Sequence, residues 1–127
     1  MSRKQTLESL SQFEWEIMNM VWDLGSASAR EVLGALPQEH QRAYTTIQTY
    51  LERLVEKKFL SKQKLGLVNF YRPLVLREKA VHKETRRFID QVFSGSTSQL
   101  ATYLIGQGEI EPSDLEKIRK MLGDDHE

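Results

Sequence analysis

The sequence predicts a mainly α-helical protein with one small β-hairpin, and two observations carry that prediction. Apolar residues recur at helical spacing in six stretches of the 127-residue chain, as in amphipathic helices. Two short runs that flank Gly66 have the composition of paired strands. A helix with a polar first turn directly before a basic hairpin is typical of a winged helix-turn-helix. We expect that fold over residues 1–75 and a helical dimerisation region over residues 76–127.

Residues typical of helix N-termini indicate where the first two helices begin. Ser11 and Ser28 each stand three residues before a glutamate, which is the spacing of a capping box. Gly25 is expected to end the first helix and Pro37 the second. Between them, residues 26–28 are long enough for a minimal strand only.

The third helix is expected from about Tyr44 to Lys57, and the hairpin follows it. Its apolar positions share one face and are Ile47, Leu51, Leu54 and Val55. Strands are expected over residues 60–64 and 69–74, with residues 65–68 as the turn. Pro73 lacks a backbone donor and should lie at a strand end or a sheet edge.

Beyond residue 75 the pattern predicts three amphipathic helices and no strands. Residues 94–96 break the first, the second covers about 98–105, and the third begins at Pro112 and closes at Gly123. Short helices cannot bury so many apolar residues alone, so they either fold back on the first domain or pair with a second copy. We favour pairing. The candidate dimerisation residues are Phe88, Val92, Leu100, Tyr103, Leu104, Leu115, Ile118, Met121 and Leu122.

Charge is distributed unevenly although the whole chain has a net charge of zero. Residues 40–72 carry seven basic and two acidic side chains, a net charge of +5. Residues 108–127 carry three basic and seven acidic side chains, a net charge of −4. Scattered surface charge is the alternative interpretation, but a basic region that coincides with a predicted helix-turn-helix favours contact with an anionic partner.

The polar first turns of the third helix and the basic hairpin have the chemistry to bind duplex DNA. A glutamine can form two hydrogen bonds to adenine, and lysines on alternate strand positions can contact phosphates. A helix N-terminus can hold a phosphate. The candidate DNA-binding residues are Ser28, Arg30, Tyr44, Thr45, Thr46, Gln48, Thr49, Arg53, Lys62 and Lys64.

Each candidate also has a structural interpretation. The threonines could serve only as helix caps in solvent, and Lys62 and Lys64 could protect an edge strand from aggregation. Arg53 could form an ion pair with Glu52 or Glu56. For Trp15 and Trp22, which share a second helical stripe, we expect core or subunit packing.

Several function classes are not expected. His40, His82 and His126 are isolated and the chain has no cysteine, so we expect neither a metal site nor a cofactor. The sequence shows no nucleophile–base pair, and we do not expect an enzyme. It has no long apolar run or signal-peptide pattern, so we expect a cytoplasmic protein that does not insert into a membrane. A protein-interaction module and a small-molecule-responsive regulator remain as alternatives to DNA binding.

Three motifs together carry a family resemblance. They are residues 14–18 (EWEIM) through Trp22, residues 46–49 (TIQT) with Leu51, Arg53 and Leu54, and residues 71–73 (YRP). Over about residues 10–122 the chain resembles the BlaI/MecI/CopY family of bacterial repressors. The resemblance implies a homodimer on an inverted-repeat operator. In the antibiotic-responsive members of the family, a membrane sensor-protease triggers cleavage in the dimerisation region, and the resemblance makes such a protease a candidate partner here.

The chain departs from the family pattern in three places. The bond that matches the cleaved one lies near Tyr103–Leu104, where relatives have asparagine followed by phenylalanine. Copper-responsive members use a C-terminal cysteine cluster, which is absent here. Lys58 stands where relatives commonly have glycine, so the chain needs a left-handed or altered turn there.

Overall fold

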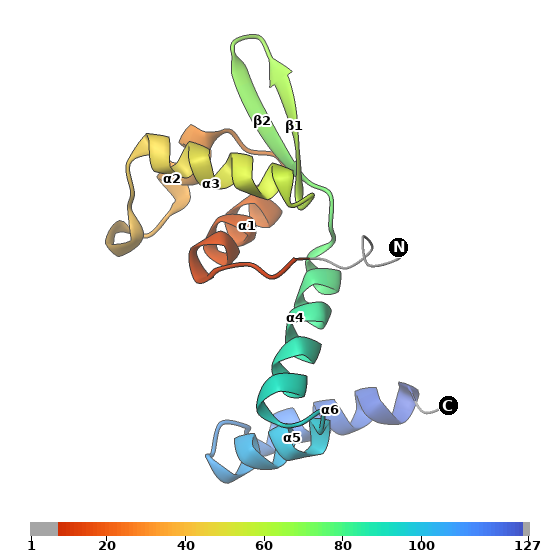
Figure 1. The fold of residues 1–127 in the computed structure, drawn as a ribbon. Helices are drawn as coiled ribbons and strands as arrows, with labels where there is room; N and C mark the ends of the chain where they lie inside the picture. The colour runs from red at the N-terminus through yellow and green to blue at the C-terminus, as the bar shows by residue number, and fades with distance from the viewer. Residues whose placement is uncertain (1–7, 126–127) are drawn as a thin grey trace. The chain divides into compact units, whose positions relative to one another are not determined.

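The computed structural model describes residues 8–125, with side chains at all of these positions except 119 and 122–125. The elements, in chain order, are α1 (Gln12–Leu24), α2 (Ala29–Ala35), the 3-10 turn η2 (Gln38–His40), α3 (Tyr44–Glu56), β1 (Leu60–Leu65), β2 (Val68–Pro73), α4 (Arg77–Val92), α5 (Thr97–Gly106) and α6 (Pro112–Asp125) (Figure 1). The predicted fold class, mainly helical with one hairpin, is confirmed.

The chain divides into two compact units, and the division falls inside α4. The first unit ends at Glu84 and the second begins at Thr85. The predicted separation of functions at residue 75 remains a prediction. None of the helices in the described part of the chain is long and apolar enough to cross a membrane.

Both predicted capping boxes are present. The Ser11 hydroxyl accepts a hydrogen bond from the Glu14 backbone N–H at 3.2 Å, and the Glu14 carboxylate accepts one from the Ser11 N–H at 2.8 Å. Ser28 and Glu31 form the same reciprocal pair at 3.1 and 3.0 Å. Each box satisfies two backbone donors that a helix N-terminus otherwise leaves unpaired, which is why α1 and α2 begin where the sequence predicts.

One continuous core fills the first unit. It joins α1, α2 and α3 to the hairpin and to the first turn of α4. Its fully buried side chains include Ile17, Met18, Val21, Val32, Ile47, Leu51, Leu54, Phe59, Leu60 and Tyr71. The Trp22 indole donates to the Val75 carbonyl at 2.9 Å, and Arg77 donates to Asn19 at 3.1 Å. These bonds attach the start of α4 to α1.

The hairpin is antiparallel and its turn is tighter than predicted. Strand pairing continues to Leu65 and Val68, which leaves Gly66 and Leu67 as the turn. Gly66 has φ of 66°, a conformation that two-residue hairpin turns require. Ala27 exchanges backbone hydrogen bonds of 3.0 and 2.8 Å with Tyr71, so the predicted minimal strand forms a bridge to β2.

Lys58 makes the predicted left-handed turn between α3 and β1. Its φ is 71°, a region that side chains with a Cβ adopt at a cost. The N–H of Phe59 then bonds to the Leu54 carbonyl at 3.0 Å, and the Phe59 side chain enters the core. The hairpin is therefore attached to the end of α3 by three residues only.

Glu14 is a buried carboxylate that ties α1 to the end of α3. It is 1% exposed, and Lys57 Nζ lies 2.8 Å from its Oε1. Burial alone would raise the pKa of Glu14, but the hydrogen bonds from Lys57 and from the Ser11 backbone outweigh it and lower the pKa below its usual value. The Lys57 ammonium also donates to the Ser9 carbonyl at 3.1 Å.

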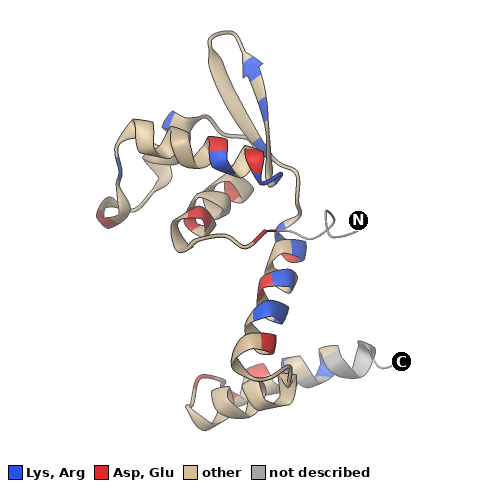
Figure 2. Ribbon diagram, in the orientation of Figure 1, with Lys and Arg blue, Asp and Glu red and all other residues tan. Residues whose placement is uncertain are grey.

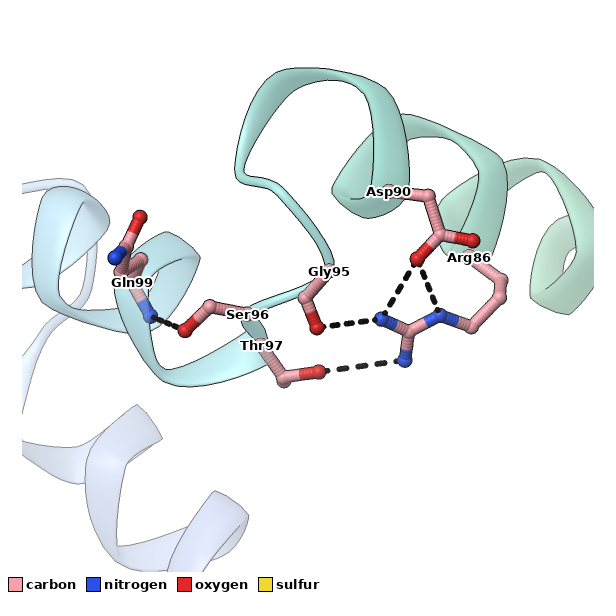
Figure 3. A network of polar contacts seen from close by, with 6 residues as sticks. All are labelled: Arg86, Asp90, Gly95, Ser96, Thr97 and Gln99. Atoms are coloured by element: carbon pink, nitrogen blue, oxygen red, sulfur yellow. Dashed lines mark hydrogen bonds and ion pairs between the residues drawn. The ribbon is translucent and has the colours of Figure 1, made fainter.

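The second unit contains the rest of α4 with α5 and α6, and an arginine organises its first corner. Arg86 bonds to Asp90 at 3.3 Å, to the Gly95 carbonyl at 3.0 Å and to the Thr97 hydroxyl at 3.4 Å (Figure 3). Ser94 and Gly95 have φ of 51° and 84°, so the chain turns sharply here. The three predicted helices are present, although α6 continues through Gly123 instead of ending there.

We expect Lys58→Gly to stabilise the protein, because glycine adopts a left-handed φ without the steric cost that a Cβ carries. The gain should be about 0.5–1 kcal/mol, since the greater entropy of glycine in the unfolded chain offsets part of the relief. Urea unfolding measures it as a higher midpoint. Lys58→Ala removes the same charge but keeps the Cβ, and an equal gain in that variant would contradict the backbone explanation.

We expect Glu14→Gln to destabilise the protein at neutral pH by about 1–3 kcal/mol, because it weakens charged hydrogen bonds to a buried group. The folded state lowers the pKa of Glu14, so this stabilisation is present above about pH 4.5 and is lost as the pH falls through the folded pKa. Unfolding measured from pH 7 to pH 3 should therefore show a shallower loss of stability in the variant.

Glu31→Gln is the matched control for this prediction. Glu31 has the same place in a capping box, but it is exposed and has no lysine partner among the contacts described. Its replacement should change stability by less than about 0.5 kcal/mol. Equal effects at the two positions would show that the buried ion pair with Lys57 contributes nothing.

Candidate nucleic-acid interface

An open groove of about 610 Å³ runs between α3 and β2. Its lining is polar and comes from the outward face of α3 and from alternate positions of β2. The lining residues are Thr45, Gln48, Thr49, Glu52, Arg53, Glu56, Asn69 and Tyr71. Because Ile47, Leu51 and Leu54 are fully buried, helical geometry turns this polar face away from the core.

A second groove, of about 310 Å³, lies between the start of α2, the start of α3 and the hairpin tip. Its lining residues are Ser28, Ala29, Arg30, Tyr44, Gln48, Leu67, Val68, Asn69 and Tyr71. Gln48, Asn69 and Tyr71 line both grooves. The two grooves are therefore adjacent, and Gln48 stands where they meet.

The threonines of α3 do not cap the helix, so the capping part of that alternative is wrong. The N-cap residue is Ala43, and it provides no side-chain hydrogen bond. The Thr49 hydroxyl instead donates to the Thr45 carbonyl at 3.0 Å. Thr45 and Thr49 are exposed in the first groove, whereas Thr46 is half-buried and lines neither groove.

Two arginines are held by aromatic rings at the edges of this surface. The Arg30 guanidinium lies 5.0 Å from the centre of the Tyr44 ring, and that of Arg53 lies 4.7 Å from the Tyr50 ring. Stacking of this kind restricts a long side chain without neutralising its charge. Arg53 thus stacks on an aromatic ring, and the ion pair with Glu52 or Glu56 is absent from its described contacts.

The hairpin presents one polar face to α3. In its register Lys62 stands opposite Tyr71, and Lys64 stands opposite Asn69, so these four side chains share a face. This confirms that the two lysines lie on one side of β1. Figure 2 shows basic segments along β1 and acidic and basic segments alternating toward the end of α3.

Glu52 joins α3 to both strands of the hairpin. Its carboxylate accepts hydrogen bonds from Tyr71 Oη at 2.7 Å and from Lys62 Nζ at 3.0 Å. Burial alone would raise the pKa of Glu52, but these two bonds together lower it. Burial and the adjacent Glu52 carboxylate raise the pKa of the Tyr71 phenol, which stays protonated and donates its hydrogen.

Sequence reasoning missed Glu52 and Asn69 as groove residues. A glutamate in a basic segment is expected to be an exposed counter-charge, and its contact with Lys62 depends on the hairpin geometry. Asn69 carried a usable signal, because it alternates with Tyr71 along β2 and so must share its face. Ser28 lines the second groove, and its hydroxyl is already engaged in the capping box.

The candidate dimerisation residues divide by exposure. Phe88, Val92, Tyr103, Ile118 and Met121 are exposed by 40–65%, and Leu100, Leu104 and Leu115 are half-buried. The side chain of Leu122 and the whole of His126 lie outside the described residues. Within the described part, no group of three or more His, Asp or Glu side chains could hold a metal ion.

Known proteins of one family match nearly the whole length of this chain. A family model for the penicillinase repressor matches residues 10–124. The methicillin resistance regulatory protein MecI of Mammaliicoccus sciuri is 26% identical over 113 residues, which cover 89% of this chain and 92% of MecI. The penicillinase repressor of Staphylococcus aureus is 25% identical over 124 residues, which cover 98% of this chain and 97% of that repressor.

A solved structure is similar to the first unit in its fold. The DNA-binding domain of the repressor BlaI is 32% identical, with a TM-score of 0.51, over 57% of this chain and 88% of that domain. It matches the winged-helix arrangement of three helices and a hairpin that the structure shows. The chain therefore belongs to the penicillinase repressor family, the BlaI/MecI type of DNA-binding repressors.

Proposed function

We propose that this chain is a sequence-specific repressor that binds an inverted-repeat operator as a homodimer. The observation that carries the proposal is the position of Gln48, at the junction of two grooves lined by α3 and the hairpin. In this model α3 is the recognition helix and enters the major groove, as in other helix-turn-helix proteins. Gln48 then reaches base edges while the flanking residues reach the backbone.

Base contacts are assigned to the groove face of α3. Gln48 can form two hydrogen bonds to one adenine. The Thr49 hydroxyl is already bonded to the Thr45 carbonyl, so Thr49 offers mainly its methyl group, which suits the methyl of thymine. Thr45 lies one turn earlier on the same groove face.

Backbone contacts are assigned to the side chains around this face. Arg30, Tyr44, Arg53 and Lys64 are the groups we propose for phosphate contacts, together with the start of α2 at Ser28. Such contacts fix the protein's position on DNA and make binding sensitive to salt. Thr46 is proposed for a backbone contact, since it is half-buried outside both grooves.

The second unit is proposed to join two copies. Five of its candidate apolar residues remain exposed in the single chain, although apolar side chains of that size gain stability from burial. Pairing with another copy supplies that burial and makes the second half-site contact intramolecular. A sensor-protease that cuts α5 near Tyr103–Leu104 would undo this gain, after local unfolding of the helix exposes the bond.

Selection of bound duplexes from a random DNA pool should enrich an inverted repeat with a fixed half-site spacing. On a single half-site, Gln48→Ala should weaken binding about tenfold to hundredfold, because one bidentate base contact contributes about 1–3 kcal/mol, and on the full repeat two such contacts are lost. It should also relax the base preference at one position of each half-site. Fluorescence anisotropy on matched and single-substituted duplexes measures both effects.

Gln63→Ala is the control for this experiment. Gln63 lies on β1 opposite Phe70, on the other face of the hairpin from Lys62 and Lys64, and it should leave both affinity and base preference unchanged. Failure to enrich any repeat would instead favour the use of the winged helix as a protein-interaction module.

Removal of the second unit should weaken binding to the full operator about 10²–10⁴-fold, because the linked second contact is lost. The cut belongs after Glu84, since Ala80 packs in the core of the first unit. The affinity of the fragment for a single half-site should equal the affinity of one subunit of the intact chain for the same half-site. Sedimentation equilibrium should show a monomeric fragment and a dimeric intact chain, and equal affinities for the full operator would refute the model.

A further inference from the structure

One carboxylate holds the hairpin against the recognition helix. Glu52 projects from α3 toward the polar face of the hairpin, and it contacts one residue of each strand. Lys62 and Tyr71 are direct partners in the strand register. Glu52 therefore binds one cross-strand pair from a third element, at 3.0 Å from the lysine ammonium and 2.7 Å from the phenol oxygen.

We propose that Glu52 is a positioning residue for DNA recognition, and that it engages Lys62 internally, away from the DNA phosphates. The proposal rests on the proposed function and deepens it. The sequence predicts the same role for Lys62 and Lys64, as two phosphate contacts on one strand. The structure separates them, because Lys62 is bonded to both Glu52 oxygens whereas Lys64 has no such bond among its described contacts.

The contact differs from an isolated surface ion pair, although the Lys62 and Glu52 side chains are 38% and 44% exposed. A single exposed pair contributes little, because ordering two mobile side chains offsets the attraction. Here the Tyr71 ring is only 2% exposed, and its backbone is bonded to Ala27 on the other edge of β2. One partner of Glu52 is therefore already fixed, and less entropy is lost when Lys62 joins.

The position of Asn69 follows from this contact. Asn69 is two residues before Tyr71 on the same face of β2, and it lines both grooves together with Gln48. A hairpin that swings away from α3 would carry Asn69 away from Gln48. Glu52 thus fixes the separation of two amide side chains that can each read an adenine, without contacting DNA itself.

The test compares Glu52→Gln with Glu56→Gln on the selected operator and on random DNA, over a series of salt concentrations. Both changes remove one negative charge from the same groove, but Glu56 makes no hydrogen bond to the hairpin among the described residues. Release of Lys62 should make the slope of log K against log salt steeper by about 0.9 for each half-site, which corresponds to one phosphate contact per subunit. The ratio of specific to random affinity should fall about tenfold, the size of one charged hydrogen bond.

Two further variants separate the parts of the proposal. Lys62→Met in the native background should leave the salt slope unchanged, and in the Glu52→Gln background it should remove the increase in slope. Tyr71→Phe keeps the buried ring and the Glu52–Lys62 pair, so it should lower the specificity ratio without changing the slope. Amide hydrogen exchange in β1 and β2 should be faster in Glu52→Gln and Tyr71→Phe than in the native chain.

The outcomes are distinguishable. Equal slopes and ratios in Glu52→Gln and Glu56→Gln, or a shallower slope in Lys62→Met alone, would overturn the role of Glu52 while the proposed function stands. A native chain that binds no DNA sequence preferentially would remove the proposed function and this role with it. In that case, hydrogen exchange would still report whether Glu52 fixes the hairpin.

Discussion

The left-handed turn at Lys58 is the constraint on which the rest of the structure depends. Three residues carry the chain from the end of α3 into β1, and the last of them, Phe59, is buried in the core. Because the link is short and Phe59 anchors it in the core, the hairpin must lie beside α3. The grooves, the shared position of Gln48 and Asn69, and the reach of Glu52 to both strands all follow from that placement.

The first unit has an excess of basic side chains, and some of these side chains form ion pairs within the protein. Residues 40–72 carry a net charge of +5, but two of the lysines counted there are held by Glu14 and Glu52. These ion pairs join α1 to α3 and α3 to β1, so they stabilise the arrangement of the elements. The cations of residues 40–72 that remain for a nucleic acid are fewer than composition suggests, and two of them, Arg42 and Arg53, are stacked on aromatic rings.

The sequence predicts the helices and the hairpin of the first unit to within one or two residues, because local signals determine them. Capping boxes place the starts of α1 and α2, and apolar periodicity identifies the buried face of α3. The limits of prediction appear where a contact joins distant segments. Nothing local shows that Glu14 is buried or that Glu52 meets Lys62, because both contacts exist only once the elements are packed. Even the turn was predicted too long, since pairing at Leu65 and Val68 depends on the conformation of Gly66.

The buried pair of Glu14 and Lys57 has a consequence for how such a sequence can diverge. Loss of Lys57 leaves the buried Glu14 carboxylate without its counter-charge, which costs about 3–5 kcal/mol, whereas replacement of both residues by apolar residues of similar volume is often tolerated. Single changes at these positions should be eliminated by selection, and double changes retained. Across descendants of this chain, positions 14 and 57 should therefore covary although they are far apart in the sequence.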